Sequence, residues 1–471
     1  MTDYTTDDVF ISPPPDGGYG WVVVFASFMI QLLSIGTTYS FGVLYVDFLD
    51  FFKTRRSDTA WIGSLQPCLL YLTGIFGGPI IKRVGCRPVA VIGALISAFG
   101  MTLSASANHI AVLYLTYGIL TGIGNGLMYI AAIVSVQYYF ERRRSFATGI
   151  SVGGSGAGML VFGVVTRWLL QHYHWRITLL IEGALMLLGI VFGALLLPLP
   201  TQTVRIDKHK LTIDENENDS TKENKKKERS WFCNGCSNCA EVIHIILKDA
   251  IDLSPFRNPC FVLFCFAFML FCFGYHAPFA YTPDRAIELG ESSFRASLLV
   301  SIIGMSNLVS RLGIGWFTDY NEKVRFYVGG ITLLLSGVAS LLNPFATSYI
   351  PMVIYAVWFG TLSGSFASLF PVILVDLFGM DLVEKSVGLT LATSSIAFLT
   401  SSPLCGWIID ATGSIDAPFY VAGATQTLGA VLYFMLPFCR NTQQRSEYEA
   451  ISSSNDVKDA RRGRLTSPSF A

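Results

Sequence analysis

The chain has 471 residues, of which 52% are hydrophobic and only 14% are charged, and its mean hydropathy is +0.50. Soluble domains usually carry about 25% charged residues, so this composition excludes an ordinary water-soluble protein. Lys and Arg together number 33, and so do Asp and Glu. The net charge therefore gives no electrostatic reason to expect a nucleic-acid partner.

Twelve apolar runs follow one another along the chain, each at least as long as the roughly 20 residues that a helix needs to cross a bilayer core of about 30 Å. The first six cover 21–46, 60–82, 88–107, 110–139, 145–170 and 175–199. The second six cover 258–281, 295–317, 325–345, 349–377, 385–408 and 417–438. The sequence therefore predicts an all-α integral membrane protein with twelve transmembrane helices in two six-helix halves.

Polar sequence flanks and separates the two halves. We expect a cytosolic N-terminal segment over 1–20, an N-terminal half over 21–199, a cytosolic linker over 200–257, a C-terminal half over 258–438 and a cytosolic tail over 439–471. The charge-rich composition of the linker is typical of a solvated, disordered segment. Lys and Arg are concentrated in the linker and in the loops on its side of the membrane, which favours a cytosolic position for both termini.

Two short segments are more specific than the apolar runs. The entry to the first run consists of Asp16, Gly17, Gly18, Tyr19, Gly20 and Trp21, a tight glycine-rich segment with interfacial aromatic residues. Between the fourth and fifth runs lies 139–149, which contains Arg142 and Arg143 and ends at Gly149. Both segments resemble signatures of the monocarboxylate transporter family, a branch of the major facilitator superfamily. The resemblance covers nearly the whole chain and implies a plasma-membrane secondary transporter that uses alternating access and no cofactor.

An internal repeat is visible in two loops. Gly78–Gly85 follows the second run and Gly315–Tyr320 follows the eighth, and both resemble the superfamily's loop motif in degenerate form. This implies two halves related by an axis along the membrane normal. Small residues at close helical spacing also occur in the fourth and fifth runs, at Gly118, Gly122, Gly126, Gly149, Gly153, Gly154 and Gly158. Such spacing lets helices approach closely, either as a sliding surface or as static packing.

Three linker cysteines lie close together, at Cys233, Cys236 and Cys239, and His244 follows them. Three thiolates and an imidazole are ligands that zinc accepts, but the spacing matches none of the usual zinc motifs, and we expect no metal site. Aromatic residues before the cluster favour reversible acylation near the membrane. Unmodified thiols are the alternative.

Arg311 is the clearest charged residue inside an apolar run. A guanidinium within the bilayer is costly and normally faces a cavity or a partner, and its planar fork of donors suits a carboxylate. Asn307 lies four residues earlier, hence on the same helix face. We expect both residues to bind the solute, and the alternative is a structural arginine bonded to helix ends.

The resemblance also limits the mechanism. In the proton-linked lactate and pyruvate branch, an Asp precedes the corresponding Arg by four residues and a Lys stands in the first helix, whereas the matching positions here are Asn307 and Val43. This implies transport without obligatory proton coupling, as in the divergent members, which carry aromatic amino acids, thyroid hormones, creatine or carnitine. Proton-linked lactate or pyruvate symport is the alternative. By alignment with cavity-lining positions of the family, the further solute contacts are Tyr39, Phe366 and Ser368.

Other ionisable residues in the apolar runs have two interpretations each. Glu182 is a candidate for proton coupling or a partner of Arg176 near the outer face. His276 either contacts the solute or packs in the core. Asp376 resembles a recurring family acid, which makes it a second coupling candidate, or it is an interfacial charge at a helix end.

Enzyme chemistry has no support in the sequence. No phosphate-binding glycine loop with Lys and Ser/Thr occurs, and no nucleophile with its base can be argued. The competing class is a non-transporting membrane sensor on the same fold. The expected partners are a small carboxylate-bearing solute and membrane lipid, and the resemblance adds a single-span immunoglobulin-like glycoprotein that the residues themselves do not establish.

Overall fold

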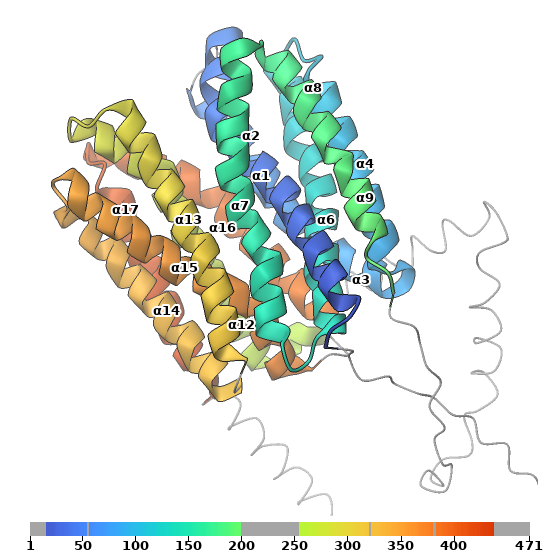
Figure 1. The fold of residues 1–471 in the computed structure, drawn as a ribbon. Coiled ribbons are helices and arrows are strands. Elements are labelled where there is room, and N and C mark those ends of the chain that lie inside the picture. The colour runs from blue at the N-terminus through green and yellow to red at the C-terminus, as the bar shows by residue number, and fades with distance from the viewer. Residues whose placement is uncertain (1–15, 54–55, 199–253, 320–321, 380–382, 438–471) are drawn as a thin grey trace, which may run out of the picture.

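The structure is a computed structural model that describes residues 16–53, 56–198, 254–319, 322–379 and 383–437. Within these ranges all regular structure is helical (Figure 1). A helix satisfies its backbone N–H and C=O groups within one segment, as a water-free bilayer core requires. The predicted all-α membrane fold is therefore confirmed.

The first half contributes six membrane-crossing segments. Its α-helices are α1 (Gly20–Phe52), α2 (Arg56–Leu72), α3 (Gly74–Val84), α4 (Cys86–Ser104), α5 (Ile110–Leu113), α6 (Thr121–Tyr139), α7 (Arg144–His172), α8 (Trp175–Met186) and α9 (Leu188–Ala194). A π-helix, η1 (Tyr114–Leu120), joins α5 to α6. Three crossings are therefore built from consecutive pieces: α2 with α3, α5 with η1 and α6, and α8 with α9.

The second half consists mainly of long uninterrupted helices. They are α12 (Pro259–Glu288), α13 (Ser293–Thr318), α14 (Glu322–Leu342), α15 (Tyr349–Phe378), α16 (Val383–Thr412) and α17 (Ala417–Phe434), with short 3-10 turns η3 (Ser254–Arg257) and η4 (Asn343–Phe345). By length and composition, 11 helical segments in the described ranges can span a membrane. The remaining crossing is α17, which packs against α12 and α14 and completes the expected twelve.

The first helix extends beyond its apolar run. The sequence predicts an end near residue 46, whereas α1 continues to Phe52. The extension is helical because its aromatic side chains pack against another helix: the rings of Phe48, Phe51 and Phe52 lie 5.4, 5.3 and 6.0 Å from the ring of Trp175 in α8. Hydropathy does not detect this packing, so the predicted helix ends too early.

The two signature segments lie in contact. Asp16 Oδ1 accepts hydrogen bonds from the backbone N–H groups of Glu141, Arg142 and Arg143, at 2.8, 3.0 and 3.4 Å. These amides belong to the turn before α7, where no helix carbonyl is available to them. Motifs that are 125 positions apart in sequence therefore form one structural unit.

We call the membrane side on which α1 begins and α17 ends the terminal side, and the other the opposite side. On the terminal side, α7 and α13 touch through glycines. A Cβ added to Gly149 would lie 2.3 Å from the carbonyl oxygen of Arg311, and one added to Gly315 would lie 2.6 Å from that of Ser145. From this contact the two helices diverge toward the opposite side (Figure 1). The expected close approach through glycines is thus found at a contact between the halves.

A second glycine contact on the terminal side joins α3 to α16. A Cβ on Gly388 would lie 2.2 Å from the carbonyl oxygen of Gly74, and one on Gly78 would lie 2.5 Å from that of Glu384. Gly78 and Gly315 hold the same place in the two loop motifs. The predicted internal repeat therefore appears in space as two glycine contacts between the halves.

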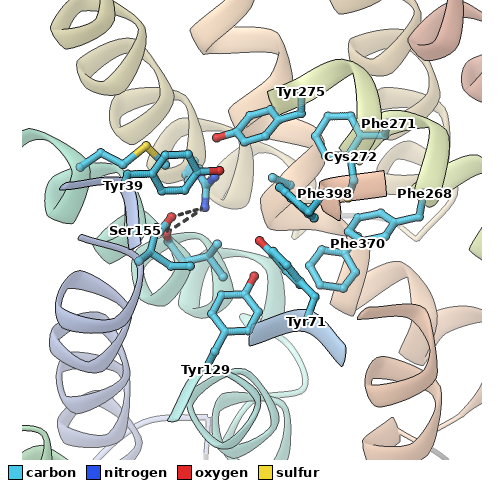
Figure 2. Close-up of a pocket in the computed structure, with 15 residues that line it drawn as sticks. Tyr39, Tyr71, Tyr129, Ser155, Phe268, Phe271, Cys272, Tyr275, Phe370 and Phe398 are labelled. Atoms are coloured by element: carbon cyan, nitrogen blue, oxygen red, sulfur yellow. Dashed lines mark hydrogen bonds between the residues drawn. The ribbon is translucent and has the colours of Figure 1, made fainter. Parts of the chain in front are cut away.

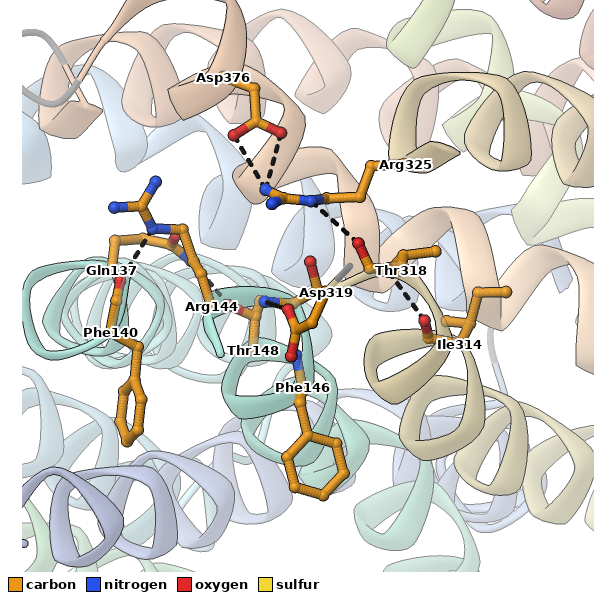
Figure 3. Close-up of polar contacts among 11 residues, drawn as sticks. Gln137, Phe140, Arg144, Phe146, Thr148, Ile314, Thr318, Asp319, Arg325 and Asp376 are labelled. Atoms are coloured by element: carbon orange, nitrogen blue, oxygen red, sulfur yellow. Dashed lines mark hydrogen bonds and ion pairs between the residues drawn. The ribbon is translucent and has the colours of Figure 1, made fainter. Parts of the chain in front are cut away.

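Polar contacts close the terminal side further. Asp319 accepts hydrogen bonds from the N–H groups of Ser145 and Phe146, at 2.7 and 3.1 Å, at the start of α7 (Figure 3). The Tyr138 hydroxyl donates to the carboxylate of Glu384, which joins α6 to α16. Burial raises the pKa of Asp319, although the two backbone amides oppose this shift.

Part of the expected organisation lies outside the described residues. This part includes nearly all of the linker and the C-terminal tail, and it contains Cys233, Cys236, Cys239 and His244.

Candidate functional site

A small cavity of about 40 Å³ lies between the two halves. Its wall consists of Ile35, Tyr39, Tyr71, Tyr129, Val152, Ser155 and Met159 from the first half and Phe268, Phe271, Cys272, Tyr275, Arg311, Ala367, Phe370 and Phe398 from the second. About 10–15 Å³ of such space holds one water molecule, so the cavity has room for roughly three. A larger solute requires side chains or the halves themselves to move.

Arg311 of α13 is the only Lys or Arg in this wall, and it is 3% exposed. Its Nε donates to Asn307 Oδ1 at 2.6 Å, while Nη1 donates to the Val152 carbonyl and to Ser155 Oγ, both at 2.8 Å. Val152 and Ser155 belong to α7, so the guanidinium bridges the halves at the cavity.

The charge of Arg311 is not neutralised by an acid in the described part of the chain. Its three acceptors are an amide, a carbonyl and a hydroxyl, and the cavity wall contains no Asp or Glu. Arg285 is also buried, but it pairs with Asp416 at 2.5 Å and donates to the carbonyls of Pro344 and Ala346. A buried cation without a counter-charge is costly. Arg311 therefore makes the cavity attractive to an anion, whereas Arg285 has the contacts of a structural residue.

Four tyrosine hydroxyls, those of Tyr39, Tyr71, Tyr129 and Tyr275, point into the same space (Figure 2). Tyr275 accepts a hydrogen bond from Asn307 Nδ2 at 3.4 Å. A phenol both donates and accepts, so these groups can bind the oxygen or nitrogen atoms of a solute. The cavity combines one cation, four phenol hydroxyls and an aromatic wall.

Two predicted solute contacts, Arg311 and Tyr39, lie in the cavity wall, and a third, Asn307, lies next to Arg311 without lining the cavity. Asn307 is fully buried beside Arg311 on one face of α13, and Tyr39 is part of the cavity wall. The binding role of these residues remains a prediction.

Two predicted contacts on α15 do not line the cavity. Phe366 lies behind the wall, with its ring 4.8 Å from that of Phe271, and Ser368 Oγ donates to the carbonyl of Ser365. The wall positions on this helix are Ala367 and Phe370 instead. The alignment selected the right helix, but the helical period turns a different face toward the cavity.

His276 lies beside the cavity rather than in its wall. Its ring is 6.3 Å from that of Tyr39 and 5.7 Å from that of Phe398, and its Nδ1 has no partner in the described structure. Asp376 pairs with Arg325 at 2.9 Å on the terminal side (Figure 3). For Asp376 this geometry favours the interfacial charge over the coupling role.

One of the two interpretations of Glu182, its pairing with Arg176, is wrong. Arg176 Nη2 donates to the carbonyl of Ala107 and to Asn108 Oδ1, at 3.2 and 2.9 Å. Glu182 instead accepts a hydrogen bond from Thr166 of α7 at 2.5 Å. The arginine lies near the opposite side, where polar loop groups rather than a carboxylate accept from its Nη2.

Several wall residues were not predicted, namely Tyr71, Tyr129, Ser155, Cys272 and Tyr275. Each lies in an apolar run, and nothing in its own helix marks it as facing the other half. Their polar atoms within otherwise apolar helices are the only signal that the sequence offered.

Comparison with known proteins gives consistent results. The family model of the Major Facilitator Superfamily matches residues 27–390. Monocarboxylate transporter 12-B of Danio rerio is 30% identical over 447 residues, which cover 93% of this chain and 91% of the relative. Monocarboxylate transporter 2 of Homo sapiens is 30% identical over 428 residues, which cover 89% of this chain and 86% of the relative.

Solved structures share the fold at low sequence identity. The human organic anion transporter MFSD10 matches with a TM-score of 0.64 and 14% identity, covering 90% of this chain and 100% of that chain. FucP in the outward conformation matches with a TM-score of 0.63 and 13% identity, covering 89% and 99%. With the match to the family model and the relatives, these similarities identify a multi-pass membrane transporter rather than an enzyme. The chain belongs to the monocarboxylate transporter family of the major facilitator superfamily.

Proposed function

We propose that this protein carries small carboxylate-bearing organic solutes across the plasma membrane, by alternating access and with weak dependence on a proton gradient. The observation that carries the proposal is Arg311, a buried cation at the cavity between the halves whose three acceptors are all neutral. The names of the relatives, which are monocarboxylate transporters, agree with an anionic solute.

The contacts of Arg311 provide a mechanism for alternating access. Two of its three hydrogen bonds cross to Val152 and Ser155 of α7, in the region where α7 and α13 touch. Opening the terminal side separates these helices and removes both bonds from the guanidinium. A bound carboxylate replaces them with charge-assisted bonds of about 1.5–3 kcal/mol each. The solute thereby lowers the cost of the transition.

The composition of the cavity wall argues against obligatory proton coupling at this site. The wall contains no Asp, Glu, His or Lys, and Val43 and Asn307 stand where the proton-linked branch has Lys and Asp. Proton-linked lactate or pyruvate symport remains the runner-up. A sensor that binds the solute without moving it is the second alternative. The uptake measurement below distinguishes each alternative from the proposed function.

Orientation is part of the proposal. With both termini cytosolic, the closed terminal side faces the cytosol and the structure represents an outward-facing state. An epitope tag inserted near Asn218 should be reached by antibody only after the cells are permeabilised. Labelling of intact cells would indicate the opposite orientation.

The central test is uptake of labelled lactate, aromatic amino acids, creatine and carnitine into cells that lack related carriers, at two external pH values. Arg311→Gln should abolish uptake of the accepted solute. Arg311→Lys should reduce apparent affinity about tenfold or more, because an ammonium keeps the charge but loses the planar fork. Arg295, which is 59% exposed and paired with Glu291, provides the control, and Arg295→Gln should transport normally.

All rates are normalised to protein at the cell surface. Near-normal uptake by Arg311→Gln would remove Arg311 from the site. Tight solute binding without uptake by the wild type would favour the sensor. Co-expression with a single-span immunoglobulin-like glycoprotein, compared with expression alone, tests whether surface delivery needs that partner.

A further inference from the structure

A second buried ionisable group lies in the first half, outside the cavity. Glu182 of α8 is 0% exposed. Its Oε1 accepts a hydrogen bond from Thr166 Oγ1 of α7 at 2.5 Å, while Oε2 has no partner in the described part of the chain. An ionised carboxylate has about four acceptor sites, so a single donor leaves its charge largely unsupported.

No base lies within ion-pair distance of Glu182 among the described residues. Arg176, on the same helix, donates to the loop before α5, and Arg167 beside Thr166 is exposed. Helix α1 carries no Lys, Arg or His, and neither does α9. The base of α4, Arg87, lies in its first turn, whereas α4 meets α8 at Thr102, next to Gly183.

The remaining titratable neighbours are phenols, a thiol, acids and two bases that lie far from Glu182 or at the surface. Tyr117 of η1 is fully buried and directs its hydroxyl to the carbonyl of Thr37, not to Glu182. The other titratable residues on the helices that pack against α8 are Tyr39, Tyr45, Asp47 and Asp50 on α1, Cys86 on α4, and Arg144 and His172 on α7. None of these except the distant Arg144 and the exposed His172 can be a cation. An isolated ion in such surroundings is far more costly than a neutral acid.

We propose that Glu182 is a proton-binding site separate from the solute cavity, which holds its proton in this conformation and makes transport respond to pH itself rather than to a pH gradient. Its ligand is the proton alone.

Helix α7 connects this site to the cavity. Thr166, the partner of Glu182, and Ser155, a partner of Arg311, lie on α7 about three turns apart, or about 16 Å along the axis. When Glu182 loses its proton, the carboxylate needs water or further donors, which the present α7–α8 contact does not supply. Helix α7, which accepts two hydrogen bonds from Arg311, is then displaced from its position against α13, and the closed terminal side is destabilised.

The functional test uses full-length protein reconstituted in liposomes with the same pH on both sides. Wild-type uptake should fall as the buffer becomes alkaline, by about tenfold for each pH unit beyond the midpoint, which is the slope of one titrating proton. Glu182→Gln keeps the shape of the side chain without its titration, so its uptake should be independent of pH over this range. The same pH profile in Glu182→Gln and in the wild type would overturn the proposal.

Two further measurements keep the proposal testable if Glu182→Gln transports poorly. Infrared spectra of purified protein at neutral pH should contain a protonated carboxyl C=O band that is absent from Glu182→Gln, and identical spectra would contradict the assignment. Thr166→Val retains the acid but removes the hydroxyl that stabilises its ionised form, so the uptake midpoint should move to higher pH. An unchanged midpoint would count against the proposal.

A gradient experiment separates this proposal from proton symport. With the external pH fixed, changing the internal pH to create a gradient should alter wild-type uptake little. A strong gradient effect that Glu182→Gln abolishes would show that the proton is carried, which overturns the regulatory role. The infrared measurement needs no solute, so its result does not depend on the proposed transport activity.

Discussion

The two contacts that close the terminal side come from one internal repeat, yet they differ in chemistry. Gly315 in the α7–α13 contact matches Gly78 in the α3–α16 contact, and each meets the backbone of the other half. Four positions before these glycines stand Arg311 in one case and Gly74 in the other. The repeat therefore provides close backbone approach twice but places a buried cation only once. We infer that the α7–α13 contact serves both closure and solute binding, and that the α3–α16 contact serves closure alone.

The positions after the glycines show the same asymmetry. Asp319 lies four residues after Gly315 and binds the first amides of α7, whereas the matching residue after Gly78 is the exposed Lys82. A cation cannot accept hydrogen bonds from helix N-terminal amides. In the α3–α16 contact, the polar link between the halves is instead the Tyr138–Glu384 hydrogen bond.

The largest expected difference comes from adding one methyl group to each contact. Gly149→Ala places a Cβ against the carbonyl of Arg311 and displaces that residue, so both solute affinity and uptake rate should fall by about tenfold, since overpacking costs about 1–3 kcal/mol. Gly388→Ala should lower the uptake rate by a similar factor and leave affinity nearly unchanged. Solute binding and initial uptake are measured on the same preparations. Gly163→Ala, where nothing lies within 4 Å, is the control. Equal losses of affinity in Gly149→Ala and Gly388→Ala would remove the distinction between the contacts.

The opposite side can be compared with the terminal side through Cys272, a buried residue of the cavity wall. Toward that side, Tyr39 meets Phe279 of the other half at 6.0 Å between ring centroids. Removing this aromatic pair, worth about 0.5–1.5 kcal/mol, should speed labelling of Cys272 by about two- to tenfold. The measurement is the rate of reaction with a membrane-impermeant thiol reagent, in Phe279→Ala with the other cysteines replaced. Phe345→Ala, at a position 72% exposed, should leave the rate unchanged. An unchanged rate in Phe279→Ala would show that this pair does not restrict entry.

A smaller effect is expected from the polar link of the α3–α16 contact. Tyr138→Phe removes the hydroxyl that donates a hydrogen bond to Glu384. At this partly exposed position the net loss of stabilising free energy is about 0.5 kcal/mol, which corresponds to about a twofold change in the equilibrium. Labelling of Cys272 from the terminal side of inside-out vesicles should rise by this factor, and labelling from the opposite side should fall. A parallel rise from both sides would indicate general loosening rather than a shift between open states.

The smallest effect concerns the pH dependence of stability. Because burial raises the pKa of Asp319, its contribution to stability is fully present below the ordinary carboxyl range and is lost as the pH rises through the raised value. The melting temperature of the purified protein should therefore decrease slightly from acidic to neutral pH, and Asp319→Asn should flatten this part of the curve. Asp410→Asn, at an exposed position, should preserve it. An unaltered slope in Asp319→Asn would show that the carboxyl does not titrate in this contact.

The sequence was sufficient to predict that the helices exist, because each membrane crossing needs a long apolar run. It was not sufficient to predict where they end, because helix ends depend on packing. The last turn of α1 is helical because of aromatic contacts with Trp175, a residue about 120 positions away. The residues of the site also divide into those that the sequence predicts and those that depend on packing. Arg311 was predictable because a cation in an apolar helix is costly, and Asn307 followed from helical spacing.

The rest of the site depends on how the two halves pack. Tyr71, Tyr129 and Tyr275 face one space only because three separate helices converge there (Figure 2). Alignment with the family led to Phe366, one position away from the wall residue Ala367, and one position on a helix is about 100° of rotation. Sequence reasoning thus located the chemistry of the site but not its walls.

The hydrogen bonds of Asp16 have a consequence for the order in which the protein is assembled. This carboxylate is synthesised before the first helix, but the amides that it binds belong to residues made 125 positions later. Since chains are synthesised at about 5–20 residues per second, the N-terminal segment waits at least several seconds for its partner. Until the turn before α7 has been made, these hydrogen bonds cannot hold the segment that precedes α1. A fusion or truncation at the N-terminus that removes Asp16 acts on this assembly step, well before any solute is bound.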